Sequence, residues 1–168
     1  PFEYVKRYMF DSTYREWFKS QFPSESIRDV LGIDLEDNSK ILNEIGMEFY
    51  DQENDKDALI YFRQALADDP YNIDAHNNAG DSLFYLGDYG TSNTHYNEVL
   101  KLDEDNIHAL LGLAENNKFQ ERLRESIKYY TKVLKLEPEN KHALAGFGAV
   151  SVSLGDSSGI EYLEKAIA

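Results

Sequence analysis

The sequence predicts an all-α solenoid of about four helix–turn–helix repeats, preceded by a short helical N-terminal segment. The first observation is a period of roughly 34 residues, which starts in the stretch 39–72. At one position of this period the residue is always small: Gly46, Gly80, Ala114 and Gly148. At the position directly before it the residue is always apolar: Ile45, Ala79, Leu113 and Phe147. The second observation is that Pro70 and Pro138 lie two periods apart. A fixed period of this length indicates stacked helix pairs, in which each pair buries its apolar face against the next.

The composition limits the classes of partner. The chain has 168 residues, of which 42% are hydrophobic, and 17 basic residues stand against 31 acidic ones, so the formal net charge is -14 at pH 7. This charge repels nucleic acid backbones and anionic lipid surfaces, and no run of about 18 apolar residues is present. We therefore expect no nucleic acid and no membrane as partners, but a basic or amphipathic protein or peptide. The absence of cysteine excludes disulfides and cysteine-ligated zinc.

Residues 1–38 are expected to form an aromatic-rich capping segment over the open face of the first repeat. Eight aromatic residues lie among the first 22: Phe2, Tyr4, Tyr8, Phe10, Tyr14, Trp17, Phe18 and Phe22. Tyr14, Trp17 and Phe18 have the i, i+3, i+4 spacing of one helix face. The alternative is a docking segment that inserts into a groove of another molecule.

Cap and stop residues divide this segment into three short helices. We expect one over 3–9, one that follows an Asp11 or Ser12 cap and ends before Pro23, and one from a Ser24 cap to Gly32. Residues 33–38 are expected to be a polar linker to the repeats.

Each repeat is predicted to be a helix, a tight turn and a second helix. In the first repeat the two apolar stripes are Ile41, Leu42, Ile45 and Phe49, then Ala58, Leu59, Phe62, Ala65 and Leu66. The polar stretch 51–57 separates the stripes, and Pro70 stops the second helix. Gly46 and Ala58 allow the two helices to approach closely, and Phe62 fills the remaining space. The repeats are expected at 39–72, 73–106, 107–140 and 141–168.

The pattern resembles the tetratricopeptide repeat. The first copy matches the family signature at Leu42, Ile45, Gly46, Phe49, Ala58, Phe62, Ala65 and Pro70. The later copies keep the same spacing, but they depart from the family signature where Glu104 replaces proline and Asn117 replaces an aromatic residue. The resemblance implies a right-handed superhelix in which the first helix of each repeat lines a peptide-binding groove.

By this resemblance, fourteen residues are expected to line the groove: Asn43, Met47, Tyr50, Asp51, Asp74, Asn77, Asp81, Phe84, Tyr85, His108, Leu111, Glu115, Lys118 and Phe119. Aromatic rings beside carboxylates suit a peptide that carries Lys or Arg. One subset of the family grips a chaperone's C-terminal carboxylate with a Lys-Asn-Asn-Lys-Arg set. The aligned positions here do not supply those cations, so an acidic C-terminus is not the expected ligand.

No catalytic site, cofactor or metal site is expected. The sequence has no glycine-rich phosphate loop, no HExxH motif and no nucleophile elbow. His108 and His142 occupy the same repeat position and should lie on neighbouring helices, but no third metal ligand accompanies them. His76 takes the place of a packing residue and is expected to be buried.

These observations predict a non-catalytic scaffold that binds a protein or peptide. One alternative is a self-assembly module that forms a homo-oligomer through the N-terminal segment or the last helix. Ile160, Leu163 and Ile167 form an apolar stripe there, which we expect another copy or further sequence to cover. The other alternative is a docking or regulatory domain of a larger enzyme.

Overall fold

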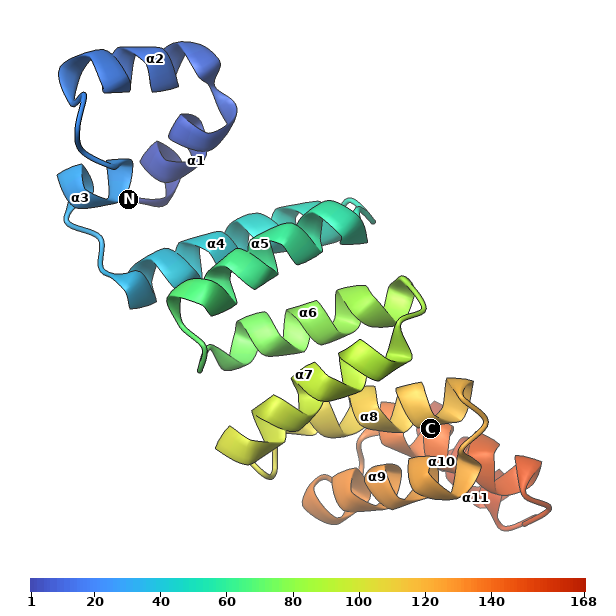
Figure 1. Cartoon of the computed structure of the whole chain (residues 1–168). Coiled ribbons are helices and arrows are strands. Elements are labelled where there is room, and N and C mark those ends of the chain that lie inside the picture. Colours follow the sequence, from blue (N-terminus) through green and yellow to red (C-terminus); the bar gives the residue numbers. More distant parts are fainter. The chain divides into compact units, whose positions relative to one another are not determined.

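The computed structural model describes all residues from Pro1 to Ala168 and contains eleven α-helices and no strand, which confirms the all-α solenoid class. The chain divides into two compact units, Pro1–Asn78 and Ala79–Ala168. The first contains α1 (Phe2–Phe10), α2 (Ser12–Gln21), α3 (Ile27–Leu31), α4 (Leu35–Tyr50) and α5 (Asp55–Asp68). Helix α6 (Ile73–Tyr85) crosses the boundary, and the second unit continues with α7 (Tyr89–Leu102), α8 (Ile107–Phe119), α9 (Leu123–Leu136), α10 (Lys141–Ser153) and α11 (Gly159–Ile167) (Figure 1). No helix combines the length and apolarity that a membrane crossing needs.

In the first unit, α1 packs on the first repeat helix. Val5 is buried with Ile33, Ile41 and Ile45 in one cluster, and Lys6 forms an ion pair with Glu48 at 2.6 Å. Helix α2 is held to the end of α1, because the Arg15 guanidinium donates hydrogen bonds to the carbonyl oxygens of Tyr8 and Met9. Phe18 is buried, with its ring edge-on to that of Tyr8 at 5.2 Å between centroids.

Two local expectations for the N-terminal segment were wrong. The cap of α3 is Ser26 rather than Ser24, because only Ser26 has an acid three residues later: its hydroxyl accepts from the Asp29 amide and the Asp29 carboxylate accepts in return. The expected linker 33–38 is mostly helix, since Asp34 caps α4 by accepting from the Asp37 amide at 2.8 Å. Acidic residues in the first turn favour a helix start there.

Helices α4 and α5 form the first helix pair at close distance. A Cβ atom added to Gly46 would lie only 2.5 Å from Cε1 of Phe62. Phe62 and Ala58 are completely buried. The small residue therefore does what the sequence predicted: it makes room for the ring that fills the space between the helices.

In the second unit, α8 and α10 contact each other, α9 packs against both, α7 packs against α8, and α11 packs against α10. One buried cluster of its core consists of Leu110, Ala114, Tyr130, Val133, Ala143 and Val150. One hydrogen bond recurs between paired helices: Ser92 donates to the Gly80 carbonyl at 2.7 Å, and Ser126 donates to the Ala114 carbonyl at 2.8 Å. These buried bonds tie the second helix of a repeat to the backbone of the first.

The last helix keeps part of its apolar stripe exposed. Leu163 is half-buried against Gly148, whereas Ile160 is 52% exposed and Ile167 is 86% exposed. The expected cover over this stripe thus remains a prediction.

Candidate functional site

A hydrogen-bonded cluster around Asp81 joins three helices of the second unit. The Tyr96 hydroxyl of α7 donates to Asp81 Oδ1 of α6 at 2.6 Å. The Nε2 atom of His108, at the start of α8, lies 2.9 Å from Oδ2 and 3.0 Å from Oδ1 of the same carboxylate. Tyr96 is buried while His108 is exposed. We call Asp81, Tyr96 and His108 the first cluster.

The same arrangement recurs one repeat later in the chain. The Tyr130 hydroxyl of α9 donates to Glu115 Oε1 of α8, and His142 Nε2 of α10 lies 3.2 Å from the same oxygen. Lys118 adds a cation, with Nζ 2.5 Å from Glu115 Oε2. We call Glu115, Tyr130, His142 and Lys118 the second cluster. The period of the sequence therefore produces a period of polar side-chain contacts.

The second cluster holds its carboxylate ionised. Burial raises the pKa of Glu115, but the hydrogen bonds from His142, Lys118 and Tyr130 outweigh burial and set the pKa to about 2. Burial, followed by the adjacent Glu115 carboxylate, raises the pKa of Tyr130. At neutral pH this site therefore contains a carboxylate and a neutral phenol that donates to it.

Glycines position the two tyrosine rings. The backbone of Gly112 lies against the ring of Tyr96, and that of Gly146 against the ring of Tyr130, so closely that neither glycine leaves room for a Cβ atom. Gly80 faces Tyr96 as well, where an added Cβ would lie 2.6 Å from ring Cε1. Each phenol is thus fixed between helices, with its hydroxyl directed at the carboxylate.

An aromatic patch consists of Phe84, Tyr85, Tyr89 and Phe119. The Phe84 ring contacts the other three rings at centroid distances of 5.3 Å for Tyr85, 5.6 Å for Tyr89 and 5.1 Å for Phe119. Phe84 and Tyr89 are half-buried, but Tyr85 is 66% exposed and Phe119 is 54% exposed. Phe84 thus packs between helices and supports two rings that solvent can reach.

Lys118 connects the second cluster to the aromatic patch. Its ammonium lies 5.5 Å from the ring centroid of Phe119 while it pairs with Glu115. A cation on this face is therefore held by a carboxylate and an aromatic ring together.

The fourteen sequence-predicted groove residues have different environments. In the second unit, the structure brings Asp81 together with His108, Glu115 with Lys118, and Phe84 with Tyr85 and Phe119. Leu111 packs against the core. In the first unit, Asn77 is buried, Asn43, Met47 and Tyr50 are half-buried, and Asp51 and Asp74 are exposed. Asn43 accepts a hydrogen bond from Asn78 at 2.9 Å.

Sequence reasoning missed the tyrosines as members of the site, and it placed His142 only on the helix next to that of His108. Tyr96 and Tyr130 occupy the repeat position of Phe62, whose ring fills the space between helices. A signal was present, however: the intervals from acid to tyrosine to histidine are the same in both copies. In the first repeat, Met47, Phe62 and Asp74 occupy these positions, so the cluster has no counterpart there.

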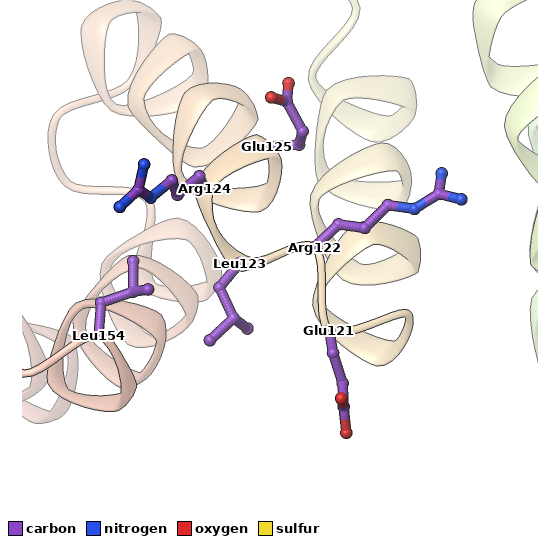
Figure 2. Close-up of a pocket in the computed structure, with 6 residues that line it drawn as sticks. All are labelled: Glu121, Arg122, Leu123, Arg124, Glu125 and Leu154. Atoms are coloured by element: carbon purple, nitrogen blue, oxygen red, sulfur yellow. The ribbon is translucent and has the colours of Figure 1, made fainter.

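No group of three or more His, Asp or Glu residues is arranged to hold a metal ion. His76 is buried, with Nε2 3.1 Å from the Pro70 carbonyl oxygen. An open pocket of about 340 Å³ lies at the α8–α9 turn, beside Leu154. Figure 2 shows that its two arginines, Arg122 and Arg124, extend in opposite directions, so they do not converge on a common ligand position.

Comparison with known families and structures agrees with this architecture. The family profile described as tetratricopeptide repeat matches residues 73–106 and 107–140. Sequence comparison with curated proteins finds no significant match.

Several solved structures are similar to the chain. The first tetratricopeptide domain of Spaghetti (RPAP3), bound to the HSP90 peptide SRMEEVD, has a TM-score of 0.69 at 23% identity, over 71% of this chain and 95% of that one. MamA 41-end from Desulfovibrio magneticus RS-1 has a TM-score of 0.71 at 19% identity, over 77% of this chain and 73% of that one. The Arabidopsis OM64 tetratricopeptide domain has a TM-score of 0.69 at 18% identity, over 71% and 98%.

At these identities the structures establish the fold, and the profile establishes the two central repeats. The matched repeats also contain the Ser92 and Ser126 bonds and both tyrosines of the clusters. Residues 73–140 thus contain two tetratricopeptide repeats, and the chain has the helical fold of the tetratricopeptide domains to which it is similar.

Proposed function

We propose that this chain is a non-catalytic scaffold that binds a basic or amphipathic protein or peptide. The binding surface is the acidic–aromatic surface of the second unit: Asp81, Phe84, Tyr85, His108, Glu115, Lys118 and Phe119. The observation that carries the proposal is the position of Lys118, whose ammonium lies 2.5 Å from Glu115 Oε2 and 5.5 Å from the centroid of the Phe119 ring. The chain's own lysine thus lies between a carboxylate and an aromatic ring, an environment that also favours the lysine or arginine of a ligand.

The exposed rings supply the apolar part of the recognition. Tyr85 and Phe119 present large rigid surfaces at low cost in side-chain entropy, and the half-buried Phe84 ring packs against both. Aromatic residues in such positions are enriched among the residues that dominate binding free energies. A ligand with apolar side chains between its basic ones would use both kinds of contact.

The charge of the surface determines which ligand we propose. The RPAP3 domain is bound to the peptide SRMEEVD, which carries three acidic residues near its end. In this chain, Asp81 and Glu115 lie on the candidate surface, and the net charge is -14. An acidic peptide would meet repulsion here, so we propose the same mode of binding with a ligand of the opposite charge.

A peptide-binding experiment tests this proposal. The full chain is titrated with fluorescent peptides from two libraries of equal hydrophobicity, one with Lys and Arg, the other with Asp and Glu. We expect binding only from the basic library, weaker at high salt because exposed charges are screened. Selection of acidic peptides, or of none, would contradict the proposal.

A pair of variants locates the surface. Phe119→Ser is expected to weaken binding of the selected peptide about tenfold or more, as removal of an aromatic anchor does. Leu136→Ser is the matched control, because Leu136 is also exposed, at 42%, but lies at the end of α9. Equal losses in both variants would place the ligand elsewhere.

Self-association is a second candidate, and the exposure of Ile160 and Ile167 on α11 supports it. A second copy is one way to remove this apolar surface from water. Light scattering over a concentration series tests it: we expect the apparent mass to rise with concentration, and Ile167→Asp to prevent the rise. A constant monomer mass at all concentrations would exclude this candidate.

A further inference from the structure

We propose that the first cluster is the subsite for one cationic side chain of the ligand, a lysine ammonium or an arginine guanidinium, with the Tyr85 ring beside it. This inference rests on the proposed function and makes it specific to one carboxylate. It follows from comparing the two clusters, which have the same design but differ in one residue.

The residue that differs is the internal cation. Lys118 pairs with Glu115 in the second cluster, and Phe84 occupies the equivalent position one repeat earlier. With neutral histidines, the second cluster sums to zero charge and the first to one negative charge. The hydrogen-bond partners of Asp81 are Tyr96 and His108, and neither carries a fixed positive charge. The first cluster therefore has the acceptor but lacks the lysine that the second supplies internally.

The Asp81 carboxylate has hydrogen-bonding capacity left. A carboxylate offers about four acceptor positions on its two oxygens. Tyr96 uses one on Oδ1, and the single His108 Nε2 lies between both oxygens. The Asp81 side chain keeps 23% of its surface exposed, more than the 16% of Glu115. A further donor can thus reach Asp81 without displacing either partner.

The ring that would contact the bound cation also has a counterpart. Phe119 lies beside Lys118 in the second cluster, and Tyr85 occupies the equivalent position one repeat earlier. Tyr85 is 66% exposed, and its ring is held edge-on by Phe84. Transferring the arrangement by one repeat places a ligand cation between the Asp81 carboxylate and the Tyr85 ring, as the Lys118 ammonium lies between Glu115 and Phe119.

Packing around Tyr96 sets the shape of the subsite. Gly80 and Gly112 allow the Tyr96 ring to fill the space between their helices, and the buried phenol fixes the orientation of Asp81. Binding therefore requires little reordering of the protein, which favours recognition of even a single side chain.

The test uses the full chain and a minimal probe, N-acetyl-lysine N-methylamide, followed by NMR. We expect the probe to shift the Asp81 carboxyl carbon and the Tyr85 ring signals in a saturable way. The uncharged analogue N-acetyl-norleucine N-methylamide should leave them unshifted. Saturable shifts of equal size from both probes, or none from the lysine probe, would overturn the subsite.

Two substitutions test the role of the internal lysine: one adds a lysine to the first cluster, and the other removes Lys118 from the second. Phe84→Lys supplies an internal lysine to Asp81 and is expected to lower the affinity for the probe at least about tenfold relative to Phe84→Met, which removes the ring without adding charge. Lys118→Met frees Glu115, so the probe should then shift Glu115 signals also. Lys128→Met removes an exposed lysine of α9 and controls for net charge. Equal affinities of Phe84→Lys and Phe84→Met would contradict the proposal.

Failure of the subsite is distinguishable from failure of the proposed function. If basic peptides bind and Phe119→Ser weakens them, but Asp81→Asn binds as well as the unmodified chain, the scaffold function stands and the subsite is wrong. If neither basic peptides nor the lysine probe binds, both proposals are wrong.

Discussion

Gly112 lies against the phenol ring of Tyr96 so closely that a Cβ atom at position 112 would overlap the ring. The same ring donates its hydroxyl hydrogen to Asp81 at 2.6 Å. A backbone position on α8 therefore determines where a phenol of α7 meets a carboxylate of α6. The relationship recurs between Gly146 and Tyr130, which contacts Glu115.

The first prediction concerns this close approach. Gly112→Ala should destabilise the protein by about 1–3 kcal/mol, because the ring or the helix must move to admit the methyl group. The measurement is the free energy of unfolding from urea titration followed by circular dichroism. Gly90→Ala is the control, since its added Cβ would meet only an Asp88 oxygen at 3.8 Å and alanine favours the helix. Similar losses for both variants would show that the Tyr96 contact is not the cause.

The second prediction concerns the first helix pair. Gly46→Leu should cost on the order of 1–3 kcal/mol or more, because Phe62 already fills the space beside Gly46. The double variant Gly46→Ala with Phe62→Leu should lose less stability than the sum of the two single variants, since the smaller side chain makes room for the methyl group. Strictly additive losses in the double variant would argue against direct contact.

The third prediction concerns pH and stability. The folded-state pKa of Glu115 is about 2, below the ordinary value of 4.5. Glu115 therefore stabilises the fold fully above pH 4.5, and this contribution is lost as the pH falls toward 2. Glu115→Gln should remove that part of the acid dependence of the unfolding free energy, a difference of about 1–3 kcal/mol.

The control for the third prediction is Glu125→Gln. Glu125 is exposed and pairs with Lys128 at the surface of α9. Exposed pairs contribute little to stability, so this variant should keep the acid dependence of the unmodified chain. An unchanged profile in Glu115→Gln would mean that the second cluster is not ionised as described.

The fold was predictable because the repeat fixes neighbours at constant offsets. The contact between Gly46 and Phe62 could be predicted from the repeat pattern, in which a small residue of the first helix lies opposite a large residue of the second. The α3 cap could also have been found, because Ser26 and Asp29 have capping-box spacing and Ser24 has no acid at that offset. The start of α4 was missed because a run of acids resembles a polar linker when its capping role is overlooked.

The site was predictable only in part. The repeat phase indicated that Asp81, His108, Glu115 and Lys118 belong to the first helices of their repeats. It did not show that Tyr96 and Tyr130 direct their hydroxyls at these carboxylates, because the contact depends on helix packing and on side-chain torsions. Nor could the phase show which acid has an internal cation, since that requires the ion pair between Lys118 and Glu115.

The last prediction concerns the pH dependence of ligand binding. His108 faces Asp81 from α8, and the Tyr96 ring of α7 lies beside it at 6.4 Å between centroids. Histidine side chains ordinarily change charge between about pH 5 and 8. Protonated His108 would neutralise the charge of Asp81, so the affinity for a basic peptide should fall as the pH is lowered from 8 to 5. Fluorescence polarisation at constant ionic strength measures this change.

The control is His108→Gln, whose side chain cannot become protonated, so the same titration should show an affinity that varies much less with pH. An undiminished pH dependence in His108→Gln would mean that another group controls the charge of the subsite.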